Sequence, residues 1–195
     1  MKLVIASNNA HKIYEIKKIL GCKFDSIMSL SEAGISHETV EDGTTFMENA
    51  TKKAREIAKI SGLPSLADDS GLTAHALGDM PGIYSARFSG GGDEENNALL
   101  LKLLSDKEDK GAHYTCAMAL AYPDGRLITA EGYMYGTITE DRRGSRGFGY
   151  DPLFIPDGEV RTVAEMTDEE KNAISHRGRA LALLLEKLTL GGSDA

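Results

Sequence analysis

Apolar residues recur along this chain with two periods, one typical of helices and the other of strands. Helical spacing of Ile13, Ile16 and Ile19 predicts a helix over residues 10–20 that ends at Gly21. Further helices are expected at 45–60, after a cap at Asp93, after Thr167, and through 181–188. Short apolar or alternating runs predict strands at 3–6, 24–27, 63–67, 114–122 and 127–135.

Polar residues and glycines mark where several of these elements begin, turn or end. Pro123-Asp124-Gly125 predicts a turn that joins the strands on either side into an antiparallel hairpin. Gly191-Gly192 is expected to end the last helix. Two helix capping boxes are predicted, Thr45 with Glu48 and Thr167 with Glu170.

The composition is that of an ordinary globular protein with an acidic balance. The chain has 195 residues, 41% of them hydrophobic and 27% charged, which suits one domain or one domain with two lobes. The net charge of -8 argues against binding a long nucleic acid polymer, which needs a basic face. A small phosphorylated ligand stays possible where a few lysines and arginines converge, and Mg²⁺ would offset the repulsion.

The two cysteines, Cys22 and Cys116, have no spacing typical of a disulfide framework or a zinc site. Both are expected to be reduced, partly buried thiols. The apolar start of the chain is too short for a secretory signal, and no run reaches the length of a membrane span. A cytoplasmic protein without a membrane partner is therefore expected.

Two adjacent carboxylates, Asp68 and Asp69, follow the apolar run at 63–67 and precede Ser70-Gly71. A strand that ends there would present both acids at the carboxyl edge of its sheet, where open α/β sheets bind ligands. Carboxylate oxygens at such an edge suit Mg²⁺, which usually keeps substrate phosphate among its ligands. The alternative is an Asx turn, because Asp and Ser both bond locally to the backbone.

The segment Ser7-Asn8-Asn9-Ala10-His11-Lys12 lies at the junction of the first predicted strand and helix. Backbone N–H groups and the positive end of the helix dipole favour an anion there, and Lys12 adds a charge. The alternative is ordinary capping by Ser7 or Asn8, which leaves a lysine in the first turn unexplained. The G-x-x-x-x-G-K-[ST] pattern is absent, so this is not the P-loop of common NTPases.

Two loops contain further candidate groups. Glu41-Asp42-Gly43 precedes the second helix, and its acids either face a site together with Glu48 or stay solvated. In the segment 146–152, glycines on both sides of Phe148 allow the backbone to approach a planar ligand and the ring to stack on a base. Asp151 would either accept a hydrogen bond from a ring N–H or orient a neighbouring residue. The alternative there is a glycine-rich turn with core aromatics.

Lys171 and the run Ser175-His176-Arg177 supply donors for phosphate or carbonyl oxygens. A solvated helix face is the alternative. Ser175 and His176 do not indicate acyl transfer, because the chain contains no G-x-S-x-G nucleophile elbow.

Six blocks of the chain resemble, in the same order, those of the non-canonical purine nucleoside triphosphate pyrophosphatases, also called inosine triphosphate pyrophosphatases. The blocks are 7–12, 41–50, 67–72, 81–88, 147–152 and 174–177. The resemblance covers essentially the whole chain. Six blocks at family-like spacing are far more specific than any one of them.

The resemblance implies a Mg²⁺-dependent hydrolase that converts ITP, XTP and dITP to the monophosphate and pyrophosphate, clearing deaminated purines from the nucleotide pool. It implies an α/β fold with an elongated mixed β-sheet flanked by helices, in which residues 1–195 form a single domain with two lobes around a central cleft. Members are usually homodimers, and the exposed face of the 114–135 hairpin is the expected dimer surface.

Roles follow from the resemblance and from the chemistry of the residues. Asp69 is expected to be the general base and a metal ligand, Glu41 a second Mg²⁺ contact, and Asp68 a support of the same centre. Asp68 stays the alternative base, because only geometry decides which of the two acids deprotonates the water. Lys12 would balance charge on the phosphates. Weaker candidates for that task are Lys53 and Arg87. The expected substrate-binding residues are Ser7, Asn8, Asn9, Ala10, His11, Lys12, Ser70, Phe148, Gly149, Tyr150, Asp151, Lys171, His176 and Arg177.

The purine is expected beside Phe148, with His176 and Arg177 donating to O6 of hypoxanthine or xanthine. Adenine has an amino group at that position, and a site built for one partner rejects such an analogue by about 10⁴-fold. Guanine also has O6, so its rejection needs a further feature.

Two alternatives stay open. Maf-type nucleotide pyrophosphatases open with Ala-Ser-x-Ser-Pro-Arg-Arg, which this chain lacks. A non-catalytic nucleotide sensor would not need a water-activating carboxylate.

Overall fold

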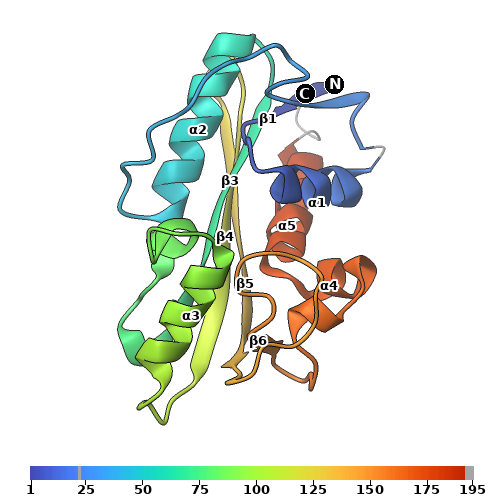
Figure 1. The fold of residues 1–195 in the computed structure, drawn as a ribbon. Helices are drawn as coiled ribbons and strands as arrows, with labels where there is room; N and C mark the ends of the chain where they lie inside the picture. Colours follow the sequence, from blue (N-terminus) through green and yellow to red (C-terminus); the bar gives the residue numbers. More distant parts are fainter. Residues whose placement is uncertain (22, 192–195) are drawn as a thin grey trace. The chain divides into compact units, whose positions relative to one another are not determined.

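A computed structural model describes residues 1–21 and 23–191. Within them the strands form one six-stranded mixed sheet in the order β2-β1-β3-β4-β5-β6 (Figure 1). β1 runs parallel to both β2 and β3, whereas β5 and β6 are antiparallel. The strands are β1 Lys2–Ile5, β2 Ser26–Ser29, β3 Ser65–Ala74, β4 Gly111–Ala121, β5 Leu127–Ile138 and β6 Phe154–Pro156.

α-Helices alternate with strands as far as β4, and two further helices follow β6, which confirms the α/β class and the mixed, helix-flanked sheet. The α-helices are α1 Ala10–Leu20, α2 Phe46–Ser61, α3 Asp93–Leu104, α4 Asp168–Ile174 and α5 His176–Gly191. Short 3₁₀ helices lie at His75–Leu77, Gly82–Arg87 and Val163–Glu165.

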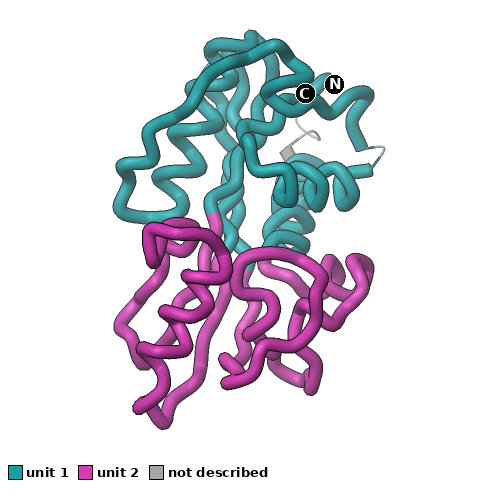
Figure 2. Tube along the Cα trace, viewed as in Figure 1, with its two compact units in different colours: residues 1–69, 116–132, 177–195 teal, residues 70–115, 133–176 magenta. Residues whose placement is uncertain are grey.

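The chain divides into two compact units (Figure 2). The first unit contains residues 1–69, 116–132 and 177–195, and the second contains 70–115 and 133–176. β3, β4 and β5 each contribute residues to both units. Each unit has its own buried apolar residues.

In the first unit, alternate residues of β3 and β4 pack into two different cores. Leu66 and Met118 lie in a core with residues of α1 and α5, such as Ile16 and Leu181. Their neighbours in sequence, Ala67 and Ala117 among them, lie in a second core with α2. Successive side chains of a strand point to opposite faces, so α1 and α5 cover one face of the sheet and α2 covers the other (Figure 1).

Several predicted boundaries are confirmed. α1 spans the predicted 10–20, and α2 begins after Thr45 with both hydrogen bonds of the capping box. The second box, Thr167 with Glu170, is also present at α4. β4 and β5 form the predicted hairpin, and its turn is closed by a hydrogen bond from the Gly125 N–H to the Tyr122 carbonyl.

Other boundaries were wrong by a few residues. The second strand begins at Ser26, not residue 24, and β5 continues to Ile138, beyond the predicted 135. α3 has Gly92 as its N-cap, not Asp93, because the Gly92 N–H donates to Glu95 while the Asp93 carboxylate accepts from the Gly149 N–H.

Two predictions fall on positions that the structure does not describe. They are the buried thiol at Cys22 and the part of the final helix stop at Gly192. Cys116 is a free, fully buried thiol, and burial raises its pKa to about 12.

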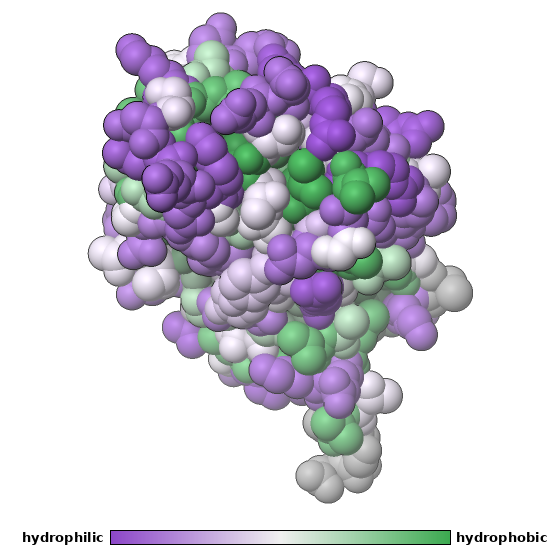
Figure 3. Space-filling view, turned by 90° about the horizontal axis from the view of Figure 1, so that it is seen from below, coloured by the Kyte–Doolittle hydropathy of each residue, from purple (hydrophilic) through white to green (hydrophobic). Residues whose placement is uncertain are grey.

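The surface shown in Figure 3 is mostly hydrophilic, with small apolar groups among the polar ones. No helix within residues 1–21 and 23–191 combines the length and apolar character that crossing a membrane requires.

Candidate active site

The acid pair lies inside β3, which corrects the prediction that the strand ends at Asp68-Asp69. β3 continues to Ala74 because Leu72 and Ala74 are buried in the core of the second unit. The neighbouring strand β1 pairs with β3 at Ser65 and Leu66, and β1 ends at Ile5. Both acids therefore lie beyond the end of β1 although they are within β3, and an isolated Asx turn does not describe them.

Because they are consecutive residues of a strand, Asp68 and Asp69 point to opposite faces of the sheet. Asp68 shares its face with Leu66 and contacts residues of α1 and α5. Asp69 shares its face with Ala67 and contacts α2. The side-chain contacts of the two acids therefore lie on opposite faces of the sheet, although Lys12 and Lys53 act electrostatically on both.

Asp68 is fully buried between two cations. Its Oδ2 lies 3.0 Å from Nη2 of Arg177 and 3.1 Å from Nζ of Lys12. Burial by itself would raise the pKa of Asp68, but Lys12 and Arg177 outweigh burial and hold it well below its usual range. Asp68 is therefore a permanent carboxylate that orients the two cations.

Arg177 is 1% exposed and also donates to the Glu15 carboxylate from α1. Burial would lower the pKa of Arg177, but Asp68 and Glu15 raise it. A guanidinium bonded to two carboxylates in the core of the first unit suits a positioning role, and this placement does not support the predicted contact with the purine.

Asp69 has a different environment, dominated by burial. It is 7% exposed, and its Oδ2 accepts from Nδ2 of Asn49 at 2.9 Å. Burial raises the pKa of Asp69 above its usual value, although Lys53 and Lys12 oppose this. A carboxylate with a raised pKa is a stronger base, which suits proton abstraction from water.

Lys53 lies between the acids of this face. Its Nζ is 2.9 Å from Oε1 of Glu41 and donates to the Asp68 carbonyl oxygen at 2.7 Å. Burial would lower the pKa of Lys53, but Asp68, Asp69 and Glu41 outweigh it and raise the pKa. The ammonium therefore stays charged at the centre of the cluster, so Lys53 is more central than the sequence suggested.

The donor chemistry here fits Mg²⁺. Glu41 and Asp69 offer carboxylate oxygens, which are the ligands that this ion prefers. No group of three or more His, Cys, Asp or Glu side chains within residues 1–21 and 23–191 is arranged to hold a metal by itself. Two carboxylates are nevertheless enough for Mg²⁺, because it usually completes its shell with water and substrate phosphate.

The β1–α1 junction is capped by Asn9, where the sequence suggested Ser7 or Asn8. Oδ1 of Asn9 accepts from the backbone N–H groups of His11 and Lys12 at 3.0 and 3.2 Å, and Ser7 Oγ accepts from the Asn9 N–H at 3.1 Å. The Asn9 side chain thus occupies two of the first-turn donors that an anion would use. The Lys12 side chain reaches Asp68 and explains the cation in the first turn.

The other acids of the 41–48 region have local partners. Asp42 pairs with the Lys52 ammonium at 2.6 Å, and Glu48 accepts from Thr44 and Thr45 as the third helical residue in the α2 capping box. Of the three candidate acids, only Glu41 joins the Lys53 cluster.

A second polar cluster lies in the second unit around Asp151. This carboxylate is 3% exposed and accepts from the Lys171 ammonium at 2.8 Å, from the Phe148 N–H at 3.1 Å and from the Tyr114 hydroxyl at 3.3 Å. The Lys171 ammonium also lies 4.9 Å from the centre of the Phe148 ring. Asp151 therefore holds both the Lys171 ammonium and the backbone at Phe148.

Neighbouring predicted residues of this cluster are held firmly. The His176 ring stacks on Tyr114 with centroids 4.6 Å apart, and the Tyr150 hydroxyl donates to the Ser85 carbonyl at 2.8 Å. The Gly149 carbonyl accepts from Asn97 at 2.9 Å. Ser70 opens the second unit within β3. Arg87 is exposed and lies over the Tyr84 ring.

Two residues that sequence reasoning did not single out belong to the first cluster, Asn49 and Glu15. Asn49 interrupts the apolar face of α2 and lies one helical turn from both Thr45 and Lys53, a signal that the sequence contains. Glu15 is buried on α1 among apolar neighbours. Its partner is 162 residues away, so no local pattern indicates it.

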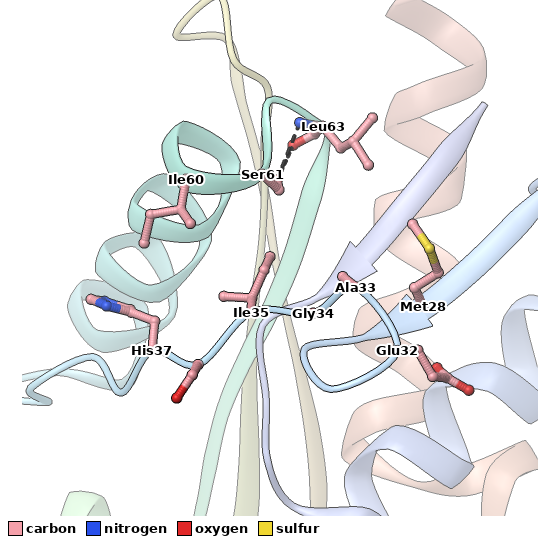
Figure 4. A pocket seen from close by; sticks show the side chains of 10 residues that line it. Met28, Glu32, Ala33, Gly34, Ile35, His37, Ile60, Ser61 and Leu63 are labelled. Atoms are coloured by element: carbon pink, nitrogen blue, oxygen red, sulfur yellow. Dashed lines mark hydrogen bonds between the residues drawn. The ribbon is translucent and has the colours of Figure 1, made fainter.

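The first unit also has a pocket of about 600 Å³ between the end of α2 and the loop that follows β2 (Figure 4). Met28, Ile35, Ile60 and Leu63 line it. None of the predicted site residues is among its lining residues, so it is separate from the chemistry described above.

Replacement of Gly147 by alanine is expected to displace Asp151 and so to lower kcat/KM for the triphosphates that the resemblance implies as substrates by about 10-fold or more. A loss of about 1.4 kcal/mol in transition-state stabilisation already corresponds to a tenfold fall. A Cβ on Gly147 would lie 2.1 Å from Oδ2 of Asp151, and the φ of +75° disfavours any side chain. Steady-state kinetics measures the loss. Gly158→Ala, also at positive φ but with open space around it, is the control. Equal kinetics for both variants would contradict the prediction.

The sheet and its acid–lysine cluster define an α/β enzyme with an acidic centre. Residues 3–187 match the Ham1 family, and the chain belongs to that family. A dITP/XTP pyrophosphatase of Desulfotalea psychrophila is 49% identical over 182 residues, 92% of this chain and 82% of that protein. One from Clostridium perfringens is 49% identical over 197 residues, 96% of this chain and 97% of that protein.

A solved structure agrees with these sequence matches. The HAM1 protein of Coxiella burnetii superposes with a TM-score of 0.88 at 39% identity, over 97% of this chain and 98% of that chain. The family predicted from the six sequence blocks is confirmed, and so is the α/β fold with its mixed, helix-flanked sheet.

Proposed function

We propose that this protein is a Mg²⁺-dependent nucleoside triphosphate pyrophosphatase that converts dITP, XTP and ITP to the monophosphate and pyrophosphate. The observation that carries the proposal is the buried Asp69 carboxylate, with its raised pKa, beside the Lys53 ammonium and Glu41. Relatives about half identical over nearly the whole chain bear the name dITP/XTP pyrophosphatase. The protein would remove deaminated purine nucleotides from the pool.

Hydrolysis between the α and β phosphates needs a deprotonated water and neutralised charge. Asp69 would accept the proton of the attacking water, because burial has raised its pKa. Lys53 and Lys12 would offset the charge that builds up on the phosphate oxygens. Mg²⁺, held by Glu41 and Asp69, would supply Lewis-acid polarisation of those oxygens when bound. Asp68 would keep Lys12 in place through the 3.1 Å ion pair.

Base recognition would use the cluster in the second unit. Phe148 would stack on the purine, and Asp151 holds the backbone at this position through its hydrogen bond to the Phe148 N–H. His176 and Lys171 are the donors in this unit suited to O6 of a deaminated purine. The remaining predicted contacts, from Ser7 to Lys12 and at Ser70, Gly149 and Tyr150, stay proposals for binding the triphosphate and sugar.

Pyrophosphate release from dITP, XTP, ITP, ATP and GTP, with Mg²⁺ or with EDTA, tests the function. We expect Mg²⁺-dependent release that favours dITP, XTP and ITP over ATP and GTP by about 100-fold or more. Hydrogen bonding to a polar group of the base can supply discrimination of this size. Release that survives EDTA would contradict the metal requirement. Thermal stabilisation by ITP without any release would support a nucleotide sensor instead.

We also propose a cytoplasmic, single-domain protein that forms a homodimer through the exposed face of the β4–β5 hairpin. That face contains an aromatic group in which the His113 and Tyr135 rings are 5.3 Å apart and Tyr133 and Tyr135 are 6.3 Å apart. Tyr135 is 51% exposed, and aromatic residues are enriched at protein interfaces.

Replacement of Tyr135 by glutamate is expected to convert the dimer to a monomer, because a charge would be buried at the interface. Light scattering coupled to size-exclusion chromatography measures the mass. Val160→Glu, which alters an 81% exposed apolar residue elsewhere in the second unit, should leave the dimer intact. A monomeric wild type, or a dimeric Tyr135 variant, would rule out this surface.

A further inference from the structure

We infer that Asn49 is a positioning residue that holds Asp69 and the loop bearing Glu41 in the arrangement that metal binding requires. This inference rests on the proposed function and extends it to a residue outside the expected ligand and substrate contacts.

The Asn49 side chain links a loop to a strand from the first turn of α2. It is 1% exposed. Its Oδ1 accepts from the Gly43 N–H at 2.8 Å, and its Nδ2 donates to Oδ2 of Asp69 at 2.9 Å. A backbone N–H requires an acceptor and a carboxylate requires a donor. Each end of the amide is therefore matched to its partner, and a reversed amide would break both bonds.

Gly43 shows how closely the loop approaches the helix. A Cβ at this position would lie 2.6 Å from Oδ1 of Asn49 and 2.9 Å from Cβ of Glu48. Only glycine lets the backbone come this near. The backbone of Gly43 therefore packs directly against α2, and Glu41 lies two residues before this contact in the sequence.

Lys53, one helical turn further along α2, makes a second link between the same loop and β3. It contacts the Glu41 carboxylate at 2.9 Å and the Asp68 carbonyl at 2.7 Å. The two links differ in charge. A metal ion or phosphate would redistribute the contacts of the Lys53 ammonium, whereas the neutral Asn49 amide has no net charge to repel a cation. Asn49 is thus suited to keep the two carboxylates in place when charged ligands arrive.

Replacement of Asn49 by alanine tests this role. We expect the Kd for Mn²⁺ to rise about 10–100-fold, the usual cost of removing a partner of a metal ligand. Electron paramagnetic resonance measures free Mn²⁺ with the protein alone and with α,β-methylene-dITP, which cannot be cleaved between those phosphates. In steady-state assays kcat for dITP should fall by a similar factor at limiting Mg²⁺, while KM for dITP changes less than about threefold.

A second buried asparagine provides the matched control. Asn96 is 2% exposed and bonded at both ends, to the Ser89 N–H at 2.8 Å and the Ala86 carbonyl at 3.2 Å, within the second unit. Asn96→Ala should lower Tm as Asn49→Ala does, but leave the Kd for Mn²⁺ unchanged. Gly43→Ala keeps the Asn49 amide yet displaces it, so this variant should also weaken Mn²⁺ binding.

Unchanged Mn²⁺ affinity in both Asn49→Ala and Gly43→Ala would overturn the inference, as would an equal loss in Asn96→Ala. These outcomes are distinguishable from failure of the proposed function. If the wild type releases no pyrophosphate from any triphosphate, the function is wrong, and Mn²⁺ binding by the protein alone still decides whether Asn49 positions the carboxylates.

Discussion

Asp69→Asn is expected to lower kcat for dITP by about 10²–10⁴-fold, the usual contribution of a general base, with the fold retained. The amide cannot accept the proton from water at neutral pH, whereas the Asp69 carboxylate has a pKa raised by burial. The fold should persist because asparagine has the same shape and its carbonyl oxygen can still accept from Asn49, as Oδ2 of Asp69 does at 2.9 Å. Pyrophosphate release with saturating Mg²⁺ measures the loss.

The matched control is Asp124→Asn, which makes the same change at the turn of the β4–β5 hairpin. Asp124 pairs with Arg126 at the surface, and its side chain is 54% exposed. Loss of the Asp124 charge should leave kcat within about twofold of the wild-type value, since surface substitutions usually shift free energies by no more than about 0.5 kcal/mol. A folded Asp69→Asn enzyme with near-normal turnover would remove Asp69 from the role of base.

Arg177→Ala is expected to destabilise the protein by about 3–5 kcal/mol, the typical cost of removing one partner of a buried ion pair. The guanidinium is 1% exposed and bonds both Asp68 and Glu15, so its removal leaves two buried carboxylates short of a counter-ion. Urea denaturation at pH 7 measures the change. Arg179→Ala, at an exposed position on the same helix, should change stability by no more than about 0.5 kcal/mol.

The pH dependence gives a second check. The pKa of Asp68 is lowered in the folded protein, with Lys12 and Arg177 outweighing burial. Its contribution to stability is therefore present above the unfolded pKa, about 3.9, and is lost as the pH falls below that value towards the folded pKa. Without Arg177 the pKa of Asp68 should rise, so the variant should lose less stability on acidification than the wild type.

The same variant separates two roles for Arg177. A positioning residue should affect dITP and ATP hydrolysis alike, through the geometry of Asp68. Wild-type stability together with a selective rise in KM for ITP over ATP would show that Arg177 reads the base, as the sequence motif had suggested.

The sequence by itself determined the parts of this protein that depend on neighbouring residues and on matched motifs. Helical spacing placed α1 at 10–20, and two Thr-x-x-Glu patterns located the starts of α2 and α4, because caps act over a single turn. The Pro123-Asp124-Gly125 turn placed the hairpin. Six ordered blocks indicated the family, which the Ham1 match confirmed.

The tertiary structure decided how the chemical groups are paired. The sequence placed Asp68 and Asp69 side by side at a strand end, but β3 runs through both and sends them to opposite faces. Arg177 meets Asp68 across 109 residues of chain, and Asn49 meets Asp69 across 20. Such pairs form only after distant helices pack on the sheet. Periodicity and capping report interactions within about one helical turn, so they could not predict which acid each lysine or arginine pairs with.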